Sequence, residues 1–253
     1  MMNATKDTRS PVRRLLFFLL FVLPCAALGQ QGSGAPGWGR IWQERMTIGQ
    51  AELDSAFRLA EKGHPAEAIA IIDSIIARDP SNWRPYFLKS AVLVLAKRGD
   101  EALKEIDTSI GLARKGRVSP GLLAELYASK ARSCMDYGRY ADAKRSLDSA
   151  LRLRPNDTTT LNDLAWMLAT AKDSRVRDAR RAVALATKAC ELDRWSNAFT
   201  IDTLAAAQAA AANFSDAVKY QQLAIAKLEP NDRKTQLPAM QQRLQQYYAG
   251  RTE

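Results

Sequence analysis

The side chains that could do chemistry are few. The 253-residue chain has one histidine, His64, which excludes a His-rich metal site and any two-histidine mechanism. Its three cysteines are too few for a four-cysteine zinc site or a scaffold of several disulfides. His64 precedes Pro65 in a predicted turn, where a structural role is favoured over a catalytic one.

Motifs that carry enzyme chemistry are also missing. The sequence has no Gly-rich phosphate loop, no Gly-x-Ser-x-Gly elbow and no His-Glu-x-x-His pair. Acidic pairs such as Asp100-Glu101 stand where a helix is predicted to begin, and negative charge is favourable there without any acid–base role. We therefore expect no enzyme activity and no cofactor.

The first 29 residues are typical of a secretory signal peptide. A basic start that ends at Arg14 is followed by nine apolar residues, 15–23, then by Pro24 and small residues up to Gly29. This predicts export to the periplasm or the extracellular space. An uncleaved anchor over residues 15–28 is the alternative, although the apolar run is short for a bilayer. Lipidation at Cys25 is disfavoured by Pro24, and membrane contact is expected only if the segment is retained.

Net charge points toward partners of opposite sign. The formal charge is +10, and it would be +7 without residues 1–29, which hold four basic residues and one acidic residue. Such a surface favours acidic proteins or anionic polymers. Basic stretches at 114–117 and 175–181 are expected to be solvated loop or helix faces. They lack the interleaved aromatic residues of a nucleic-acid platform, so no nucleic acid is expected as a partner.

Internal repetition predicts the fold. After a Gly/Pro/Ser-rich linker over residues 30–43, helical patterning is almost continuous. Five segments place a turn residue shortly before an alanine, and these alanines are spaced by 34, 41, 39 and 35 residues: Ala68, Ala102, Ala143, Ala182 and Ala217. A period near 34 with a helix on each side of a turn indicates stacked helical hairpins.

On these residues the chain resembles the tetratricopeptide repeat (TPR) family. The third repeat fits best; its motif residues are Tyr127, Lys130, Ala131, Cys134, Ala143, Leu147, Ala150 and Pro155. The C-terminal half is similar to a pair of repeats that recurs in exported bacterial TPR proteins, including an insertion over residues 171–178 within the fourth repeat. The resemblance implies an all-α solenoid of about five hairpins, with repeats over residues 49–82, 83–116, 124–157, 158–197 and 198–231.

Two features of the helix ends follow from the same pattern. Pro80, Pro155 and Pro230 should each end a second helix, and the Ser, Asn or Asp residues after them should cap the next helix. The TPR array is expected over residues 44–234, and residues 235–253 after it should form a capping helix and tail that shield the last hairpin from water.

The resemblance also places a binding face. First helices of TPR hairpins line a concave groove, and the matching positions here suggest seven partner-binding residues: Phe57, Arg84, Phe87, Arg132, Asn162, Trp166 and Asp202. For the aromatic residues, packing between repeats is an equally good explanation. The lysine and asparagine that some TPR proteins use to hold a partner's C-terminal carboxylate are replaced here by Leu53 and Phe57, so that clamp is absent.

These observations together suggest a non-catalytic scaffold or adaptor of the cell envelope that binds a peptide or helix of a protein partner on the concave face. The alternative is an envelope-associated binder of anionic cell-wall or membrane polymers through a basic surface. The two hypotheses differ in whether groove residues or surface charge control binding.

Overall fold

The computed structural model describes residues 38–252 and, from residue 49 on, their side chains. The predicted signal peptide and most of the predicted linker lie outside the described residues. The chain divides into two compact units, with unit 1 ending at Val118 and unit 2 beginning at Ser119. Every regular element described is helical, which confirms the all-α fold class.

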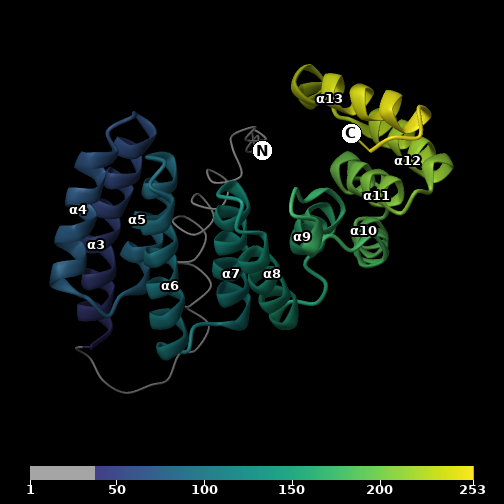
Figure 1. The fold of residues 1–253 in the computed structure, drawn as a ribbon. Coiled ribbons are helices and arrows are strands. Elements are labelled where there is room, and N and C mark those ends of the chain that lie inside the picture. Colours follow the sequence, from purple (N-terminus) through teal and green to yellow (C-terminus); the bar gives the residue numbers. More distant parts are fainter. Residues whose placement is uncertain (1–37, 253) are drawn as a thin grey trace, which may run out of the picture. The chain divides into compact units, whose positions relative to one another are not determined.

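Unit 1 contains two helical hairpins (Figure 1). The first pairs α3 (Trp38–Glu61) with α4 (Pro65–Arg78), and the second pairs α5 (Trp83–Leu95) with α6 (Gly99–Lys115). Helix α5 also packs against both helices of the first hairpin, so the two hairpins share one core.

Unit 2 repeats this arrangement and ends in a single helix. Its hairpins are α7 (Pro120–Asp136) with α8 (Tyr140–Leu153), α9 (Thr158–Thr170) with α10 (Ala179–Leu192), and α11 (Ala198–Ala210) with α12 (Phe214–Lys227). Helix α13 (Pro230–Tyr248) packs on α12. A short 3-10 turn, η1 (Ser174–Val176), lies in the predicted insertion between α9 and α10.

Small residues let the paired helices approach closely. The five alanines at the twentieth motif position are all buried, and so are the small residues at the eighth position: Ala56, Ser90, Ala131, Ala165 and Ala205. A larger side chain at either place would force the two helices of a hairpin apart.

Four of the hairpins turn in the same way. In the turn that follows each of their first helices, a single residue adopts a left-handed backbone. Its φ is 87° at Gly63, 60° at Lys97, 69° at Gly138 and 62° at Ala212. The next amide then donates to a carbonyl five residues earlier, as from His64 to Leu59 at 3.0 Å. This satisfies a carbonyl that the end of the helix leaves open. Glycine suits this position because it has no Cβ to clash.

Two of the three helix caps predicted from the sequence are present in the structure, and the third is not. The side chains of Asn82 and Asp157 accept hydrogen bonds from backbone amides in the first turns of α5 and α9. The expected cap after Pro230 is wrong, since α13 begins at Pro230 itself and not at residue 235. Proline fits the first turn of a helix because its missing N–H would have no partner there.

The start of the first helix is also earlier than expected. Helix α3 begins at Trp38, so residues 38–43 are helical and not linker. The sequence from Arg40 to Ile48 contains no glycine or proline, and nothing in it stops a helix. Within residues 38–252, no helix has both the length and the apolarity to cross a bilayer.

Candidate functional site

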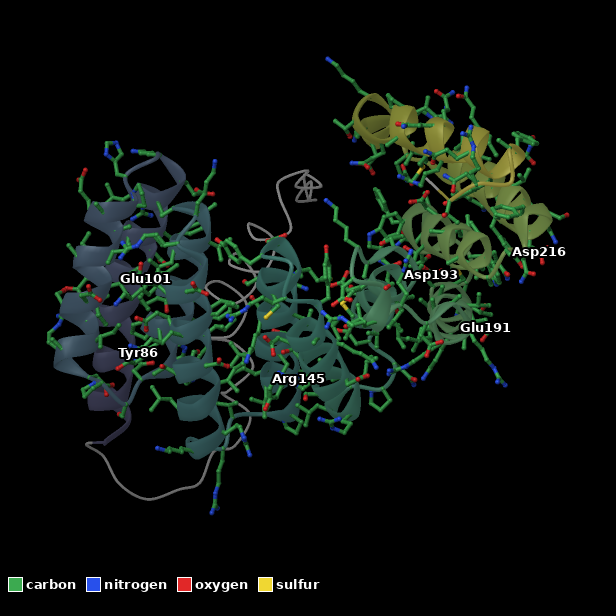
Figure 2. The ribbon with its side chains drawn as sticks, in the orientation of Figure 1. Tyr86, Glu101, Arg145, Glu191, Asp193 and Asp216 are labelled. Carbon is green, nitrogen blue, oxygen red and sulfur yellow. The ribbon has the colours of Figure 1, made fainter. Side chains whose placement is uncertain are left out.

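The first helices of unit 2 are joined by side chains on a common face. Arg132 of α7 pairs with Asp163 of α9, with 3.3 Å between Nη1 and Oδ2. Arg243 of α13 reaches both α9 and α11. We define the first-helix face of unit 2 by the residues of α7, α9 and α11 at groove positions of the repeat, together with Asp163: Glu125, Arg132, Asp136, Asn162, Asp163, Trp166, Phe199 and Asp202. The exposed side chains of the second helices include Arg145, Glu191 and Asp216, on α8, α10 and α12 (Figure 2).

Two of the predicted groove residues are brought together by Arg243. Its guanidinium donates to both carboxylate oxygens of Asp202, at 2.7 and 2.8 Å from Nη2, and lies 5.5 Å from the centre of the Trp166 ring. A bidentate pair with an aromatic face beside it is a strong setting for a guanidinium. Asp202 is only 6% exposed, and its charge is already paired with the guanidinium of Arg243 within the chain.

Gln221 completes this network from the second helix of the same hairpin. Its Nε2 donates to Oδ1 of Asp202 at 2.7 Å, while its buried Oε1 accepts no hydrogen bond from the part of the chain that the structure describes. The side chain is fully buried at a position where earlier hairpins have Ile72, Ile106 and Leu147. Nearby, burial and the negative charge of Asp202 raise the pKa of Tyr247 to about 12.

Carboxylates on the first-helix face are poorly compensated. Burial raises the pKa of Asp163, against the opposing effect of Arg132. Burial likewise raises the pKa of Glu125, although Arg154 lies 3.2 Å away. Asp136 is exposed, and partial desolvation by the surrounding protein raises its pKa against the opposing effect of Arg132. An acidic group held in this way is relieved by an added positive charge.

Two further groups on this face lack partners inside unit 2. Oδ1 of Asn162 is buried and accepts no hydrogen bond from any residue that the structure describes. Phe199, at the second position of its repeat, is 40% exposed although it is a large aromatic residue. The sequence analysis identified Asn162 but not Phe199.

The predicted residues of unit 1 are less available to a partner. Phe87 is 4% exposed and belongs to the core, so its assignment to the groove is wrong. The cause is that α5 packs against α3, α4 and α6 together. The guanidinium of Arg84 lies 5.2 Å from the ring centre of its neighbour Trp83, and burial lowers its pKa. Phe57 is half-buried on α3.

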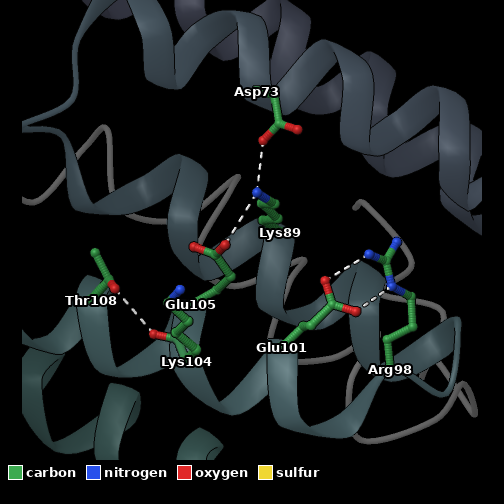
Figure 3. Close-up of polar contacts among 7 residues, drawn as sticks. All are labelled: Asp73, Lys89, Arg98, Glu101, Lys104, Glu105 and Thr108. Atoms are coloured by element: carbon green, nitrogen blue, oxygen red, sulfur yellow. Dashed lines mark hydrogen bonds and ion pairs between the residues drawn. The ribbon is translucent and has the colours of Figure 1, made fainter.

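An ion-pair bridge on unit 1 has a structural role. Nζ of Lys89 lies 2.8 Å from Asp73 of α4 and 3.1 Å from Glu105 of α6 (Figure 3). Burial alone would lower the pKa of Lys89, but the two hydrogen-bonded carboxylates outweigh it and raise the pKa. The bridge ties three helices together, and the Lys89 cation is fully engaged in it.

Chemistry-bearing groups elsewhere are also in structural settings. Cys134 and Cys190 are buried and are not joined in a disulfide, and burial raises the pKa of Cys190 to about 11, which disfavours its reactive thiolate form. His64 is half-exposed beside α4, 2.9 Å from Glu67. Over the residues that the structure describes, no three His, Cys, Asp or Glu side chains gather in a way that could hold a metal ion.

Comparison of the model with solved structures identifies the architecture. A MamA fragment from Desulfovibrio magneticus RS-1 aligns with a TM-score of 0.57 over 74% of this chain and 96% of the fragment, at 14% identity. YrrB, a TPR protein, aligns with a TM-score of 0.57 over 82% of this chain and all of its own, at 18% identity. The chain has the TPR fold. No family model matches its sequence, and no curated protein does.

The TPR fold explains which candidate residues the sequence analysis missed. Arg243 lies on α13, beyond the last repeat, where the repeat motif assigns no role to any residue. Gln221 could have been identified from the sequence, because a glutamine at a core position of a TPR repeat interrupts the apolar pattern. Phe199 occupies a TPR groove position and could have been found from that position alone.

One of the two basic stretches of this TPR chain, over residues 175–181, is partly neutralised by neighbouring acids. Arg175 forms an ion pair with Asp173 at 2.9 Å. Arg181 pairs with Asp148 on α8. The stretch over residues 175–181 is therefore less basic than its composition indicates, and it offers less to an anionic polymer.

Proposed function

We propose that the chain is a non-catalytic scaffold of the cell envelope that binds a peptide or helix of a protein partner on the first-helix face of unit 2. The observation that carries this is the coexistence on one face of an exposed aromatic residue, Phe199, and a buried acceptor without a partner, Asn162. Exposed aromatic residues and open hydrogen-bonding groups are what a partner buries at an interface.

Two further points support the proposal. The TPR fold is shared with YrrB, whose structure is described as having an unusual peptide-binding site. The predicted signal segment at residues 1–29 favours an exported protein, with retention in the membrane as the alternative. Export is a proposal that rests on the sequence of that segment alone.

Matched variants test which face binds. Phe199 on the first helix α11 and Leu192 at the end of the second helix α10 are 40% and 42% exposed. Phe199→Ala and Leu192→Ala therefore remove similar exposed apolar surface, the former from a first helix and the latter from a second helix. Both variants and the unmodified chain are used to capture proteins from native cell envelopes, after circular dichroism has shown equal helicity.

The proposal predicts partners that are retained by the unmodified chain and by Leu192→Ala but lost by Phe199→Ala. Equal retention by all three forms would contradict the first-helix face as the binding site. Retention of polymers or lipids alone, equal in all forms and abolished by salt, would replace the proposal with binding through surface charge.

A further inference from the structure

Helix α13 occupies part of the first-helix face of unit 2. Trp166 of α9 and Asp202 of α11 stand at positions that the repeat pattern directs toward the groove, yet one side chain from outside the repeats engages both. That side chain is Arg243, whose guanidinium is bound by the Asp202 carboxylate and lies over the Trp166 ring. Phe199, on the same helix as Asp202, stays 40% exposed with α13 in place. The face is therefore partly occupied and partly open.

Three side chains attach α13 to the rest of unit 2. Met240 and Tyr247 are buried in apolar clusters with residues of the α11–α12 hairpin, and Arg243 pairs with Asp202. Arg243 follows Met240 by one helical turn and precedes Tyr247 by another, so the three side chains share one face of the helix. Amphipathic helices that bind grooves use the same spacing of anchors, i, i+3 and i+7. Helix α13 is thus seated as a helical ligand would be.

The rest of α13 contributes little to this attachment. Residues 230–239 contain no buried side chain, and Pro238 lacks the N–H that an interior helical residue donates. Oε1 of Gln221, beside Asp202, is buried and accepts no hydrogen bond within the described residues, so the polar contact under α13 is incompletely satisfied. Helix α11, in contrast, is buried along most of its length. Local unfolding begins at elements with few buried contacts, so α13 should detach before the hairpins do.

We propose that α13 is an autoinhibitory helix of unit 2. While it is seated, Arg243 withholds Trp166 and Asp202 from a partner; when it leaves, the groove positions of α9 and α11 are open together. The segment that replaces it is an amphipathic helix with an apolar residue, an arginine and an aromatic residue at i, i+3 and i+7, the spacing of α13's own anchors. The inference rests on the proposed function, to which it adds a means of regulation.

A synthetic peptide of residues 229–252 is the probe. It contains α13 and its flanking residues, carries a fluorescent label, and is titrated into the full chain, into Arg243→Met and into Arg233→Met. Arg233 is an exposed residue of α13 with no ion-pair partner among the described residues, so its variant makes the same chemical change away from the anchors. Cooperative urea unfolding of all three chains first shows that each is folded.

The peptide should bind Arg243→Met at least about tenfold more tightly than the other two chains, because the weakened helix of that chain competes less for the seat. A peptide that itself carries Arg243→Met should lose most of this gain. Equal affinity for the three chains would overturn the inference, since the seat would then not open by exchange. The absence of binding to any of them would overturn it as well.

Hydrogen exchange of the unmodified chain gives a second readout that depends on no variant. The peptide is made with heavy isotopes, so that mass spectrometry tells it apart from the chain. Saturation with it should increase amide exchange in the chain's own α13 and leave that in α7 and α8 unchanged. No increase in α13 at saturation would overturn the inference.

Capture from native cell envelopes separates the two proposals. Partners that depend on Phe199 should be retained in larger amounts by Arg243→Met than by the unmodified chain or Arg233→Met. Equal retention of such partners would overturn the inhibitory role of α13 and leave the binding face intact. Adding Phe199→Ala to Arg243→Met should not change its affinity for the peptide, because Phe199 is exposed while α13 is seated. Partners retained equally by Phe199→Ala and the unmodified chain would overturn the proposed function, and its inhibition by α13 with it, whatever the peptide does.

Discussion

The substitution Arg243→Met tests whether one ion pair holds the C-terminal helix on unit 2. Methionine keeps much of the aliphatic volume beside Trp166 but removes the guanidinium. Asp202 then remains as a buried carboxylate whose one described donor is Gln221. Removing one partner of a buried ion pair costs roughly 3–5 kcal/mol because the other charge stays buried.

The expected loss lies at the lower end of that range. The Arg243 side chain is 24% exposed, and that of Asp202 is 9% exposed, so water screens part of the interaction. We expect a loss of about 3 kcal/mol in the free energy of unfolding of unit 2. For a unit of this size, that corresponds to a decrease of roughly 10 °C in Tm.

A double variant distinguishes the buried charge from lost packing. Asp202→Asn combined with Arg243→Met leaves no charge in the network, while the asparagine oxygen still accepts from Gln221. The double variant should be destabilised by only about 1 kcal/mol, the worth of an ordinary hydrogen bond. Scanning calorimetry measures the shift of the unfolding transition in each variant relative to the unmodified chain.

The reasoning would be refuted in either of two ways. A loss below about 1 kcal/mol for Arg243→Met would show that the pair behaves as an exposed salt bridge. Equal losses for the single and double variants would show that packing on Trp166, and not the uncompensated charge of Asp202, accounts for the effect.

Three more predictions follow from contacts described above. Glu105→Gln should destabilise unit 1 by about 1–2 kcal/mol in urea unfolding, and Asp73→Asn by less than about 1 kcal/mol, because Asp73 is half-exposed. Burial raises the pKa of Cys190 from 9.0 to about 11, so the folded state holds the thiol proton more tightly than the unfolded state does. The free energy of unfolding should therefore decrease as pH rises from about 9 to about 11, and Cys190→Ala should reduce that decrease. Ala131→Leu should overpack the α7–α8 hairpin and cost about 2–3 kcal/mol by thermal unfolding, whereas Ala141→Leu on the exposed face of α8 should change stability by less than about 0.5 kcal/mol.

The hairpins were predictable because their packing is local and periodic. A small residue at the eighth and twentieth positions is needed wherever two helices approach closely, so Ala131 and Ala143 reveal their hairpin without any structure. The ends of α3 and α13 were not predictable in the same way. Trp38 and Pro230 stand where the repeat pattern stops, and there only local helix preference determines where a helix begins.

The candidate site was predictable in position but not in pairing. The motif assigned Trp166 and Asp202 to one groove, yet their common partner Arg243 follows Asp202 by 41 residues and lies outside every repeat. Phe87 shows the reverse error. Its motif position faces a groove in an average hairpin, but the helices around α5 bury it here. Burial depends on neighbours that a single repeat does not specify.

Net charge and the contacts of the first-helix face would control binding in different ways, and ionic strength tells them apart. The excess of basic residues acts at a distance and is screened beyond about 8 Å at physiological salt, whereas Phe199 acts only on contact. A partner that is attracted by the net positive charge should associate more slowly as salt is added. The loss of binding caused by Phe199→Ala should instead persist at every salt concentration, because it removes a contact and no charge. Stopped-flow measurement of one captured partner with the unmodified chain and with Phe199→Ala at increasing salt therefore separates the two effects. An association rate that falls steeply with salt, together with equal binding by both forms, would mean that the overall charge, and not the first-helix face, governs recognition.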